Sequence, residues 1–243
     1  MVEKAIKVNH ISKKYNGKYV LKDVNFSVRP GTIHGFIGPN GAGKTTTLRI
    51  LTRLVLPTSG EAYVDGKSVL NDPSFNERLG WVSAEPNLPN YSVEEFLVED
   101  VGKLRDIPSH KVLRELAGSP LSSLRSQNCR SLSTGQKKIL QVFALALYKP
   151  KILLLDEPFN GLDPSVRHDL FNELERSAKK GNTILMSTHI LSDLQKFADN
   201  EQLKFDMTMI KNGRIVYTGP KTDDIEKTYE KYFIDKEKRV FKL

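Results

Sequence analysis

With 243 residues, the chain is long enough for one large α/β domain or for one domain with a small insertion. Hydrophobic residues make up 39 % of the chain and charged residues 27 %, as in ordinary soluble globular proteins. The net charge is +8, but the basic residues are spread along the chain rather than clustered. We therefore expect no direct contact with nucleic acid, which binds to concentrated positive charge.

Neither the cysteine content nor the hydropathy indicates a secreted or membrane-spanning chain. The single cysteine, Cys129, excludes an intrachain disulfide and a cysteine metal site, and it favours a reducing compartment. Residues 1–10 carry Lys and Glu where a secretory signal would have an apolar core. The longest apolar run, residues 142–148, is far shorter than the ~20 residues that span a bilayer. We expect that the chain does not cross a membrane by itself.

The chain opens with strand patterns. Residues 5–11 and 20–28 alternate apolar and polar side chains on either side of an Asn16-Gly17 turn, which predicts an N-terminal antiparallel β unit. Residues 32–37 are a short, mostly apolar run of the kind that forms a buried strand. The elements predicted after these are a helix over 45–56, a hairpin over 58–70, a strand over 79–83, helices over 92–104, 109–117 and 136–148, a strand over 152–155, a helix over 165–180, a strand over 183–187 and a hairpin over 204–217.

Strand and helix alternate along most of the chain, which favours an α/β fold with a mostly parallel central sheet and helices on both faces. Over residues 86–136 the pattern changes to helical segments separated by Pro108, Pro120 and a serine-rich loop, and we interpret this part as a small helical insertion. We expect one domain over residues 1–220, followed over residues 221–243 by a charged helix and tail.

A glycine-rich loop follows the predicted buried strand and precedes a predicted helix, the order that a P-loop requires. Glycines allow successive backbone N–H groups to point inward at phosphate oxygens. Lys44 would add positive charge at the β- and γ-phosphates, and Thr45 would offer its hydroxyl to Mg²⁺. The sequence therefore predicts a nucleoside triphosphate site with magnesium. The loop consists of Gly38, Pro39, Asn40, Gly41, Ala42, Gly43, Lys44 and Thr45.

Polar residues follow two further buried strands. Asp156 and Glu157 come at the end of the strand predicted over 152–155, and His189 follows the one over 183–187. Parallel sheets bring the carboxyl ends of their strands together. Asp156 could then hold magnesium and Glu157 could polarise the attacking water, while His189 could reach the γ-phosphate as a donor. Alternatively, the two acids are solvated loop residues and His189 is an ordinary histidine.

The helix predicted before Asp156 begins with Leu132-Ser133-Thr134-Gly135-Gln136. Ser133 is a candidate N-cap, with Gln136 three residues later as its capping-box partner. A helix N-terminus with a free hydroxyl and a glycine N–H can also form a second anion site. Both interpretations are compatible with the sequence.

In this order, these motifs resemble the nucleotide-binding subunit of ATP-binding cassette (ABC) transporters, to about Pro220. The loop up to Thr46 resembles the Walker A motif, the segment Leu132 to Gln136 the ABC signature with Thr134 where Gly is commonest, and residues 152–157 the Walker B strand. Gly161-Leu162-Asp163 resembles the D-loop. The signature upstream of the Walker B strand distinguishes this family from other P-loop proteins.

The resemblance implies roles for particular residues. Glu157 would be the catalytic base, assisted by Lys44 and His189, and Thr45 and Asp156 would be metal ligands. Two cassettes, from identical or different chains, would sandwich ATP head to tail, so that Ser133 and Gly135 would serve the partner's nucleotide. The implied nucleotide-binding residues are Tyr15, which would stack on adenine, and Gly38, Pro39, Asn40, Gly41, Ala42, Gly43, Lys44, Thr45, Thr46, Ser133, Gly135, Gln136 and Asp163.

The sequence departs from the family at one position. A glutamine usually follows the strand predicted over 79–83 and contributes to the magnesium shell, but this chain has Ala84 and then Glu85. Ala84 has no ligating atom, whereas Glu85 could serve as a metal ligand if the loop shifts by one residue.

The resemblance implies an ATPase subunit that uses ATP and Mg²⁺ at the cytoplasmic face of the cell membrane and drives a separate multi-span membrane subunit. The GPNGAGKTTTLRIL segment and the compact insertion are most similar to exporter-type cassettes. Two alternatives remain open. One is a soluble ABC protein that acts on ribosomes or nucleic acid, and the other is a nucleotide-binding regulatory module with little hydrolysis, which Ala84 suggests.

Overall fold

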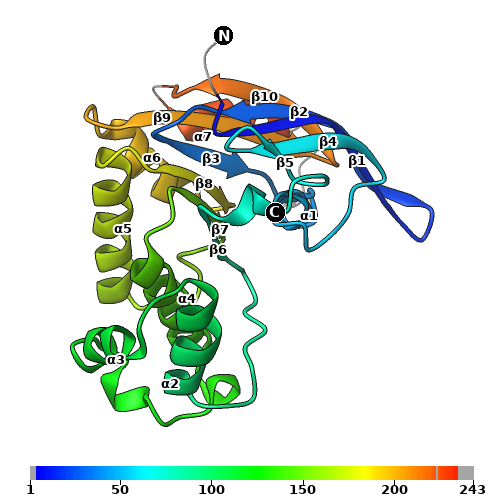
Figure 1. Cartoon of the computed structure of the whole chain (residues 1–243). Helices are drawn as coiled ribbons and strands as arrows, with labels where there is room; N and C mark the ends of the chain where they lie inside the picture. Colours follow the sequence, from blue (N-terminus) through cyan, green and yellow to red (C-terminus); the bar gives the residue numbers. More distant parts are fainter. Residues whose placement is uncertain (1–3, 223, 235–243) are drawn as a thin grey trace, which may run out of the picture.

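The central sheet has six strands in the order β10-β9-β3-β8-β7-β6, and all neighbours are parallel except β9 and β10. This computed structural model describes residues 4–222 and 224–234. The arrangement confirms the predicted α/β fold with a mostly parallel sheet (Figure 1). The strands are β3 (Thr32–Ile37), β6 (Leu79–Val82), β7 (Ile152–Asp156), β8 (Thr183–Thr188), β9 (Lys204–Lys211) and β10 (Arg214–Pro220).

Three strands at the middle of this sheet are buried along their whole length. Every residue of β3, β7 and β8 is buried, as their apolar runs predict for strands covered on both faces. In the register of the sheet, Ile184 of β8 lies between Ile33 of β3 and Leu153 of β7. The carboxyl ends of these strands therefore lie side by side, and the loops that follow them meet at one edge of the sheet.

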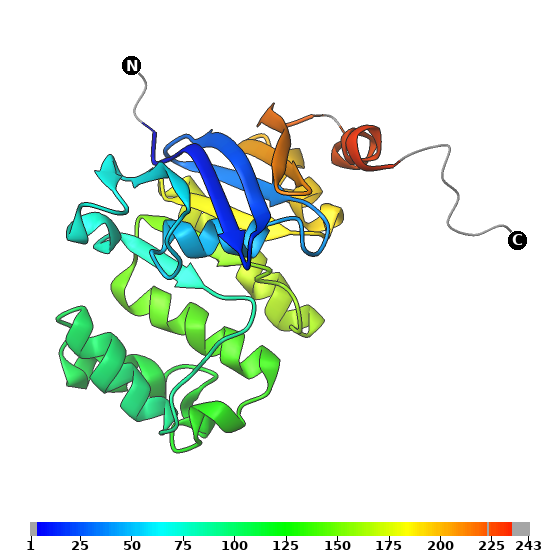
Figure 2. The same cartoon turned by 90° about the vertical axis from the view of Figure 1, so that its right-hand side faces the viewer.

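A second, antiparallel sheet of four strands in the order β2-β1-β4-β5 covers one side of the central sheet. It is drawn in blue and cyan in Figures 1 and 2. Its long first pair extends beyond the predicted strands because the Asn16-Gly17 turn is tight and lets pairing continue from Ile6↔Val28 to Tyr15↔Lys18. The strands are β1 (Ile6–Tyr15), β2 (Lys18–Val28), β4 (Ser59–Val64) and β5 (Lys67–Ser68).

The helices of the core differ from the predicted ones in two places. Helix α1 (Lys44–Leu51) was predicted to continue to residue 56, but it ends at Leu51. Arg53 adopts a left-handed backbone (φ 59°), which turns the chain out of the helix and leaves Leu54 exposed. Helix α6 (Leu191–Asp199) was not predicted. The two remaining core helices are α5 (Pro164–Lys179) and α7 (Ile225–Phe233).

The helical part projects away from both sheets (Figures 1 and 2). Its own core contains Val93, Leu97, Val112 and Leu116, which cluster with Leu140, Ala144 and Leu147 of α4. The segment predicted as one helix over 92–104 does begin at Ser92, which caps it, but it continues as a π-helix over Phe96–Gly102. The elements are α2 (Val93–Glu95), that π-helix, α3 (Ser109–Ala117), α4 (Thr134–Tyr148) and three-residue 3₁₀ turns at Ser122–Leu124 and Cys129–Ser131; a further 3₁₀ turn, Pro73–Asn76, precedes β6.

The C-terminal helix is attached to α6. The side-chain oxygen of Gln195 accepts a hydrogen bond of 3.0 Å from the backbone N–H of Ile225, and Lys221 donates to the carbonyl of Ala198. The charged helix predicted after residue 220 is thus present as α7. The tail predicted after it, from residue 235, lies outside the described residues.

Candidate ATP site

The glycine loop joins β3 to α1 and packs tightly against its surroundings. A Cβ atom added to Gly38 would lie 2.4 Å from the carbonyl oxygen of Ile210, and one added to Gly43 would lie 2.5 Å from a methyl of Leu21. Gly43 also has a φ of 113°, a conformation that favours glycine, and it gives α1 no side-chain cap. The first N–H groups of α1 are therefore not used by a capping side chain, as an anion site at a helix N-terminus requires.

The side chains of Lys44, Glu157 and His189 meet at the carboxyl ends of the central strands. The ammonium of Lys44 donates to the carbonyl oxygen of Gly38 at 2.6 Å and lies 3.5 Å from Oε1 of Glu157. The Nδ1 atom of His189 lies 3.0 Å from the same Oε1 atom. Three residues that are far apart in the sequence, and that the sequence analysis placed in one site, are thus in contact.

The carboxylate of Asp156 is fully buried beside this group. Its Oδ1 atom accepts a hydrogen bond from the hydroxyl of Ser187, but its Oδ2 atom has no hydrogen-bond partner among the described residues. A buried carboxylate oxygen without a partner is costly unless a cation or water satisfies it. Asp156 and the half-buried hydroxyl of Thr45 therefore fit a magnesium ion. In residues 4–222 and 224–234, no group of three or more His, Cys, Asp or Glu residues is arranged so that it could hold a metal ion by itself.

The structure adds residues that the sequence analysis missed. The backbone N–H of Glu157 donates a hydrogen bond of 3.1 Å to the carbonyl oxygen of Ser187. The side-chain amide of Asn160 lies 3.5 Å from Oε2 of Glu157. Lys138 of α4 donates to the carbonyl oxygen of Glu157. The sequence could have indicated this position. Lys138 lies four residues before Val142 and seven before Leu145, a spacing that places it on the apolar face of the helix.

The start of α4 contains the predicted capping box. The hydroxyl of Ser133 accepts from the N–H of Gln136 at 3.2 Å, and the Gln136 side chain accepts from the N–H of Ser133 at 2.9 Å. Gly135 lies against the backbone of Gly161, since a Cβ at position 135 would be 2.8 Å from the Gly161 carbonyl. Two motifs that resemble the signature and the D-loop are therefore in contact.

Asp163 caps α5. It accepts hydrogen bonds from Ser165 and Val166, and the bond from the Ser165 hydroxyl is the main reason that the pKa of the Asp163 carboxyl lies below its usual value. Capping α5 is a structural role that by itself explains an aspartate at this position, independently of any contact with a partner chain.

Two predicted site residues lie apart from this cluster. Tyr15 is the last residue of β1 and is 43 % exposed. The ammonium of Lys13 lies 5.0 Å from the centre of its ring. An exposed ring is free to stack on a base. Glu85 is exposed in the loop after β6, and within the described residues it forms no hydrogen bond to Asp156, Glu157 or Thr45. The present loop does not bring Glu85 to the acids.

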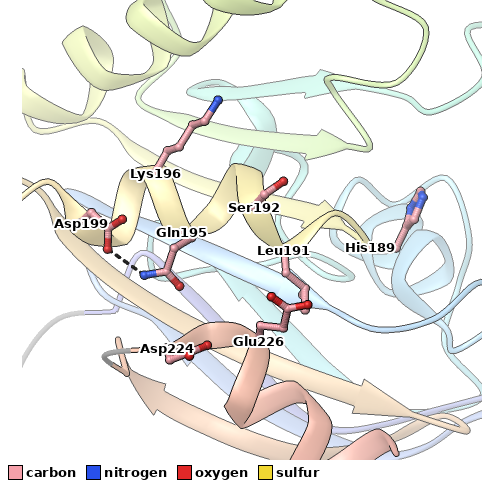
Figure 3. A pocket seen from close by; sticks show the side chains of 8 residues that line it. All are labelled: His189, Leu191, Ser192, Gln195, Lys196, Asp199, Asp224 and Glu226. Atoms are coloured by element: carbon pink, nitrogen blue, oxygen red, sulfur yellow. Dashed lines mark hydrogen bonds between the residues drawn. The ribbon is translucent and has the colours of Figure 1, made fainter.

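A cavity of about 780 Å³ lies between α6 and the start of α7, with His189 among its lining residues (Figure 3). It does not include the glycine loop. In Figure 3, Gln195 and Asp199 are joined by a hydrogen bond on α6, while His189 stands at one end. Its lining consists of His189, Leu191, Ser192, Gln195, Lys196, Asp199, Asp224 and Glu226.

The motifs and their contacts agree with what this chain resembles among known proteins. A family model described as ABC transporter matches residues 21–160, which is more than half of the chain. The chain is 31 % identical over 220 residues to the Nod factor export ATP-binding protein I of Ralstonia nicotianae, covering 88 % of this chain and 66 % of that protein. It is also 31 % identical over 204 residues to the spermidine/putrescine import ATP-binding protein of Mesoplasma florum, covering 82 % of this chain and 58 % of that protein.

A solved structure of the ATP binding subunit of an ABC transporter superposes on the chain with a TM-score of 0.79 at 27 % identity, and the match covers 96 % of each chain. The chain belongs to the ABC transporter family, whose ATP-binding subunits hydrolyse ATP to power transport. The family and the fold predicted from the sequence are thereby confirmed. The chain spans 66 % and 58 % of the two curated relatives, and no helix of the described residues is long and apolar enough to cross a bilayer.

Proposed function

We propose that this chain binds and hydrolyses MgATP as one of a pair of cassettes and drives substrate movement through a separate multi-span membrane subunit. It would act at the cytoplasmic face of the cell membrane. The observation that carries this proposal is the contact of Lys44 and His189 with one oxygen of Glu157, next to the unpartnered oxygen of Asp156. The glycine loop, which starts α1 with free N–H groups, lies directly beside them.

In this proposal the chain's own residues act on the γ-phosphate and on water. The loop from Gly38 to Thr46 wraps the phosphates, and Lys44 moves from the Gly38 carbonyl and Glu157 to the β- and γ-oxygens. Glu157 is then free to accept a proton from the attacking water, and His189 donates to the γ-phosphate as charge develops there. Thr45 and Asp156 would hold Mg²⁺, which neutralises phosphate charge.

The second half of the site would come from a second cassette, identical or different. Ser133, Gly135 and Gln136 lie at the N-terminus of α4, exposed or half-buried, where the Ser133 hydroxyl and the Gly135 N–H suit a phosphate. Tyr15 would stack on adenine, and Asp163 would lie at the contact between the two chains. Glu85 would join the magnesium shell only after a shift of its loop.

We further propose that transport runs outward. The GPNGAGKTTTLRIL segment supports this direction. The relatives include an export protein and an import protein, and each name applies to that protein only. Reconstitution with the membrane subunit, followed by measurement of substrate accumulation on each side, checks the direction.

The experiment that tests hydrolysis is the steady-state ATPase rate of the wild type beside Glu157→Gln. We expect the substitution to lower the rate by about 10²–10⁴-fold with ATP binding retained, because only the base is lost. Equal and negligible rates in both proteins would favour the regulatory module, for which the exposed position of Glu85 is the supporting observation. Binding to polysomes or DNA without membranes would favour the soluble alternative.

A further inference from the structure

Lys138 is the most deeply buried basic side chain near the site, with an exposed fraction of 1 %. It lies on α4, on the apolar face that also carries Val142 and Leu145. Burial in this position lowers the pKa of its ammonium to about 8, while the nearby acids Asp156 and Glu157 oppose the decrease. A buried ammonium costs stability unless acids or hydrogen bonds compensate it, so the packing of apolar groups does not explain a lysine at this position.

The hydrogen bond of Lys138 goes to the backbone of Glu157 and not to its carboxylate. Its Nζ atom donates to the carbonyl oxygen of Glu157, and this is its only hydrogen bond within the described residues. The N–H of the same residue is held by Ser187. Both sides of Glu157 are thus anchored, one to β8 and the other to α4.

The backbone of Glu157 needs such anchors. Its φ is 48°, a left-handed conformation that a non-glycine residue adopts at a cost of ~1–2 kcal/mol. This conformation directs the side chain so that Oε1 lies 3.0 Å from His189 and 3.5 Å from Lys44. Release of the carbonyl would let the residue relax to an ordinary conformation, and the carboxylate would then leave its place.

We propose that Lys138 is a positioning residue for ATP hydrolysis, tying the signature helix α4 to the backbone of Glu157 so that the carboxylate stays aligned. The inference rests on the proposed function of Glu157 as the base. It also joins two half-sites: Ser133 begins α4 and would contact the partner's nucleotide, and Lys138 lies five residues along the same helix. When the start of α4 moves on contact with the partner's nucleotide, this movement is thereby transmitted to Glu157, the base that acts on the chain's own nucleotide.

The test uses Lys138→Met, which keeps the unbranched apolar part of the side chain but removes the ammonium. We expect kcat to fall by about 10-fold or more, because small misalignment of a reacting group has effects of up to ~10². The dissociation constant for ATP does not rise by more than about twofold, since Lys138 makes no hydrogen bond to the glycine loop among the described residues. The matched control is Lys137→Met, the half-buried neighbour on the same helix, whose kcat stays at the wild-type value.

A double variant separates alignment from general damage to the fold. If Lys138 acts through Glu157, then Lys138→Met added to Glu157→Gln lowers the residual hydrolysis no further. A further loss of about 10-fold in the double variant, equal to the loss in the single one, would overturn the proposal, because general damage is additive.

The remaining outcomes are also decisive. A Lys138→Met protein with wild-type kcat overturns the inference and leaves the proposed function intact, whereas a wild type without hydrolysis overturns both. If Lys138→Met melts below the wild type, the shorter donor Lys138→Gln is measured in the same two backgrounds. For Lys138→Gln we then expect a partial recovery of kcat with unchanged ATP affinity. If Lys138→Gln is fully folded but its kcat equals that of Lys138→Met, the proposed role of the hydrogen-bond donor is rejected.

Discussion

The ammonium of Lys44 lies 3.5 Å from the carboxylate of Glu157, and each side chain is about nine-tenths buried. One group is expected to hold the phosphates and the other to activate water. In the present structure they hold each other, so ATP must compete with Glu157 for the same positive charge. The ion pair therefore opposes nucleotide binding as well as positioning the base.

This competition predicts that Glu157→Gln binds MgATP about two- to tenfold more tightly than the wild type, since a neutral amide no longer competes for Lys44 and no longer repels the phosphates. Equilibrium binding measured before turnover checks this. Glu173→Gln, which removes an exposed carboxylate of α5, serves as the control and leaves the affinity unchanged. A weaker affinity for Glu157→Gln would show that the carboxylate helps to bind the nucleotide.

A methyl group at Gly38 is expected to disable the glycine loop. The added Cβ would meet the Ile210 carbonyl at 2.4 Å, so Gly38→Ala should destabilise the fold by about 1–3 kcal/mol and abolish ATP binding. The control is Gly181→Ala, where φ is 88° but nothing lies within 4 Å of the new atom. That variant should lose about 1 kcal/mol and bind ATP normally. Urea unfolding and nucleotide titration measure both, and normal ATP binding by Gly38→Ala would contradict the tight packing.

The two roles of Ser133 can be separated by an acidic substitution. Aspartate is as good an N-cap as serine, so Ser133→Asp should unfold at the wild-type temperature, whereas Ser133→Ala should lose about 1 kcal/mol. The aspartate would repel the phosphates of a partner's nucleotide, and hydrolysis should fall by about 10² or more. Thermal unfolding and the ATPase rate are compared in the three proteins. Full activity in Ser133→Asp would place the signature helix outside the site.

The buried histidine His34 predicts a pH-dependent stability. Burial lowers the pKa of His34 to about 4 from 6.5, and its Nε2 atom lies 2.8 Å from the hydroxyl of Thr208. The unfolded chain binds a proton more readily, so this contribution to stability is complete above pH 6.5 and is lost as the pH falls toward 4. At pH 5 the loss is about 2 kcal/mol. Urea unfolding at pH 7 and pH 5 should show a smaller difference for His34→Gln than for the wild type, while the exposed control His168→Gln should match the wild type.

Much of the fold was predictable because apolar runs identify buried strands directly. Strands β3, β7 and β8 were found to within one residue, and the polar residues at their ends define the centre of the site. The alternation of strands and helices was enough to predict which ends would meet. The resemblance then supplied the family, which the comparisons confirmed.

The rest depends on contacts that no local pattern encodes. Helix α6 has only nine residues, and its N-cap residue Ile190 makes no side-chain hydrogen bond to it, so the usual start signal is missing. The early end of α1 results from the left-handed backbone at Arg53, a residue that sequence patterns do not mark as a helix stop. The bond from Lys138 to the Glu157 carbonyl joins residues 19 apart in the sequence and depends on how α4 packs on β7.

The parallel pairing of β3, β8 and β7 also determines where the chain can tolerate insertions and deletions over evolution. Between Glu157 and His189 the sequence contains α5, its connections and β8, and of these α5 and its connections lie outside the strands and could gain or lose whole turns. A single residue inserted within β7 or β8 would instead reverse which side of the sheet each later side chain faces. Homologous chains should therefore vary widely in the spacing between these motifs but keep the strand lengths that precede them.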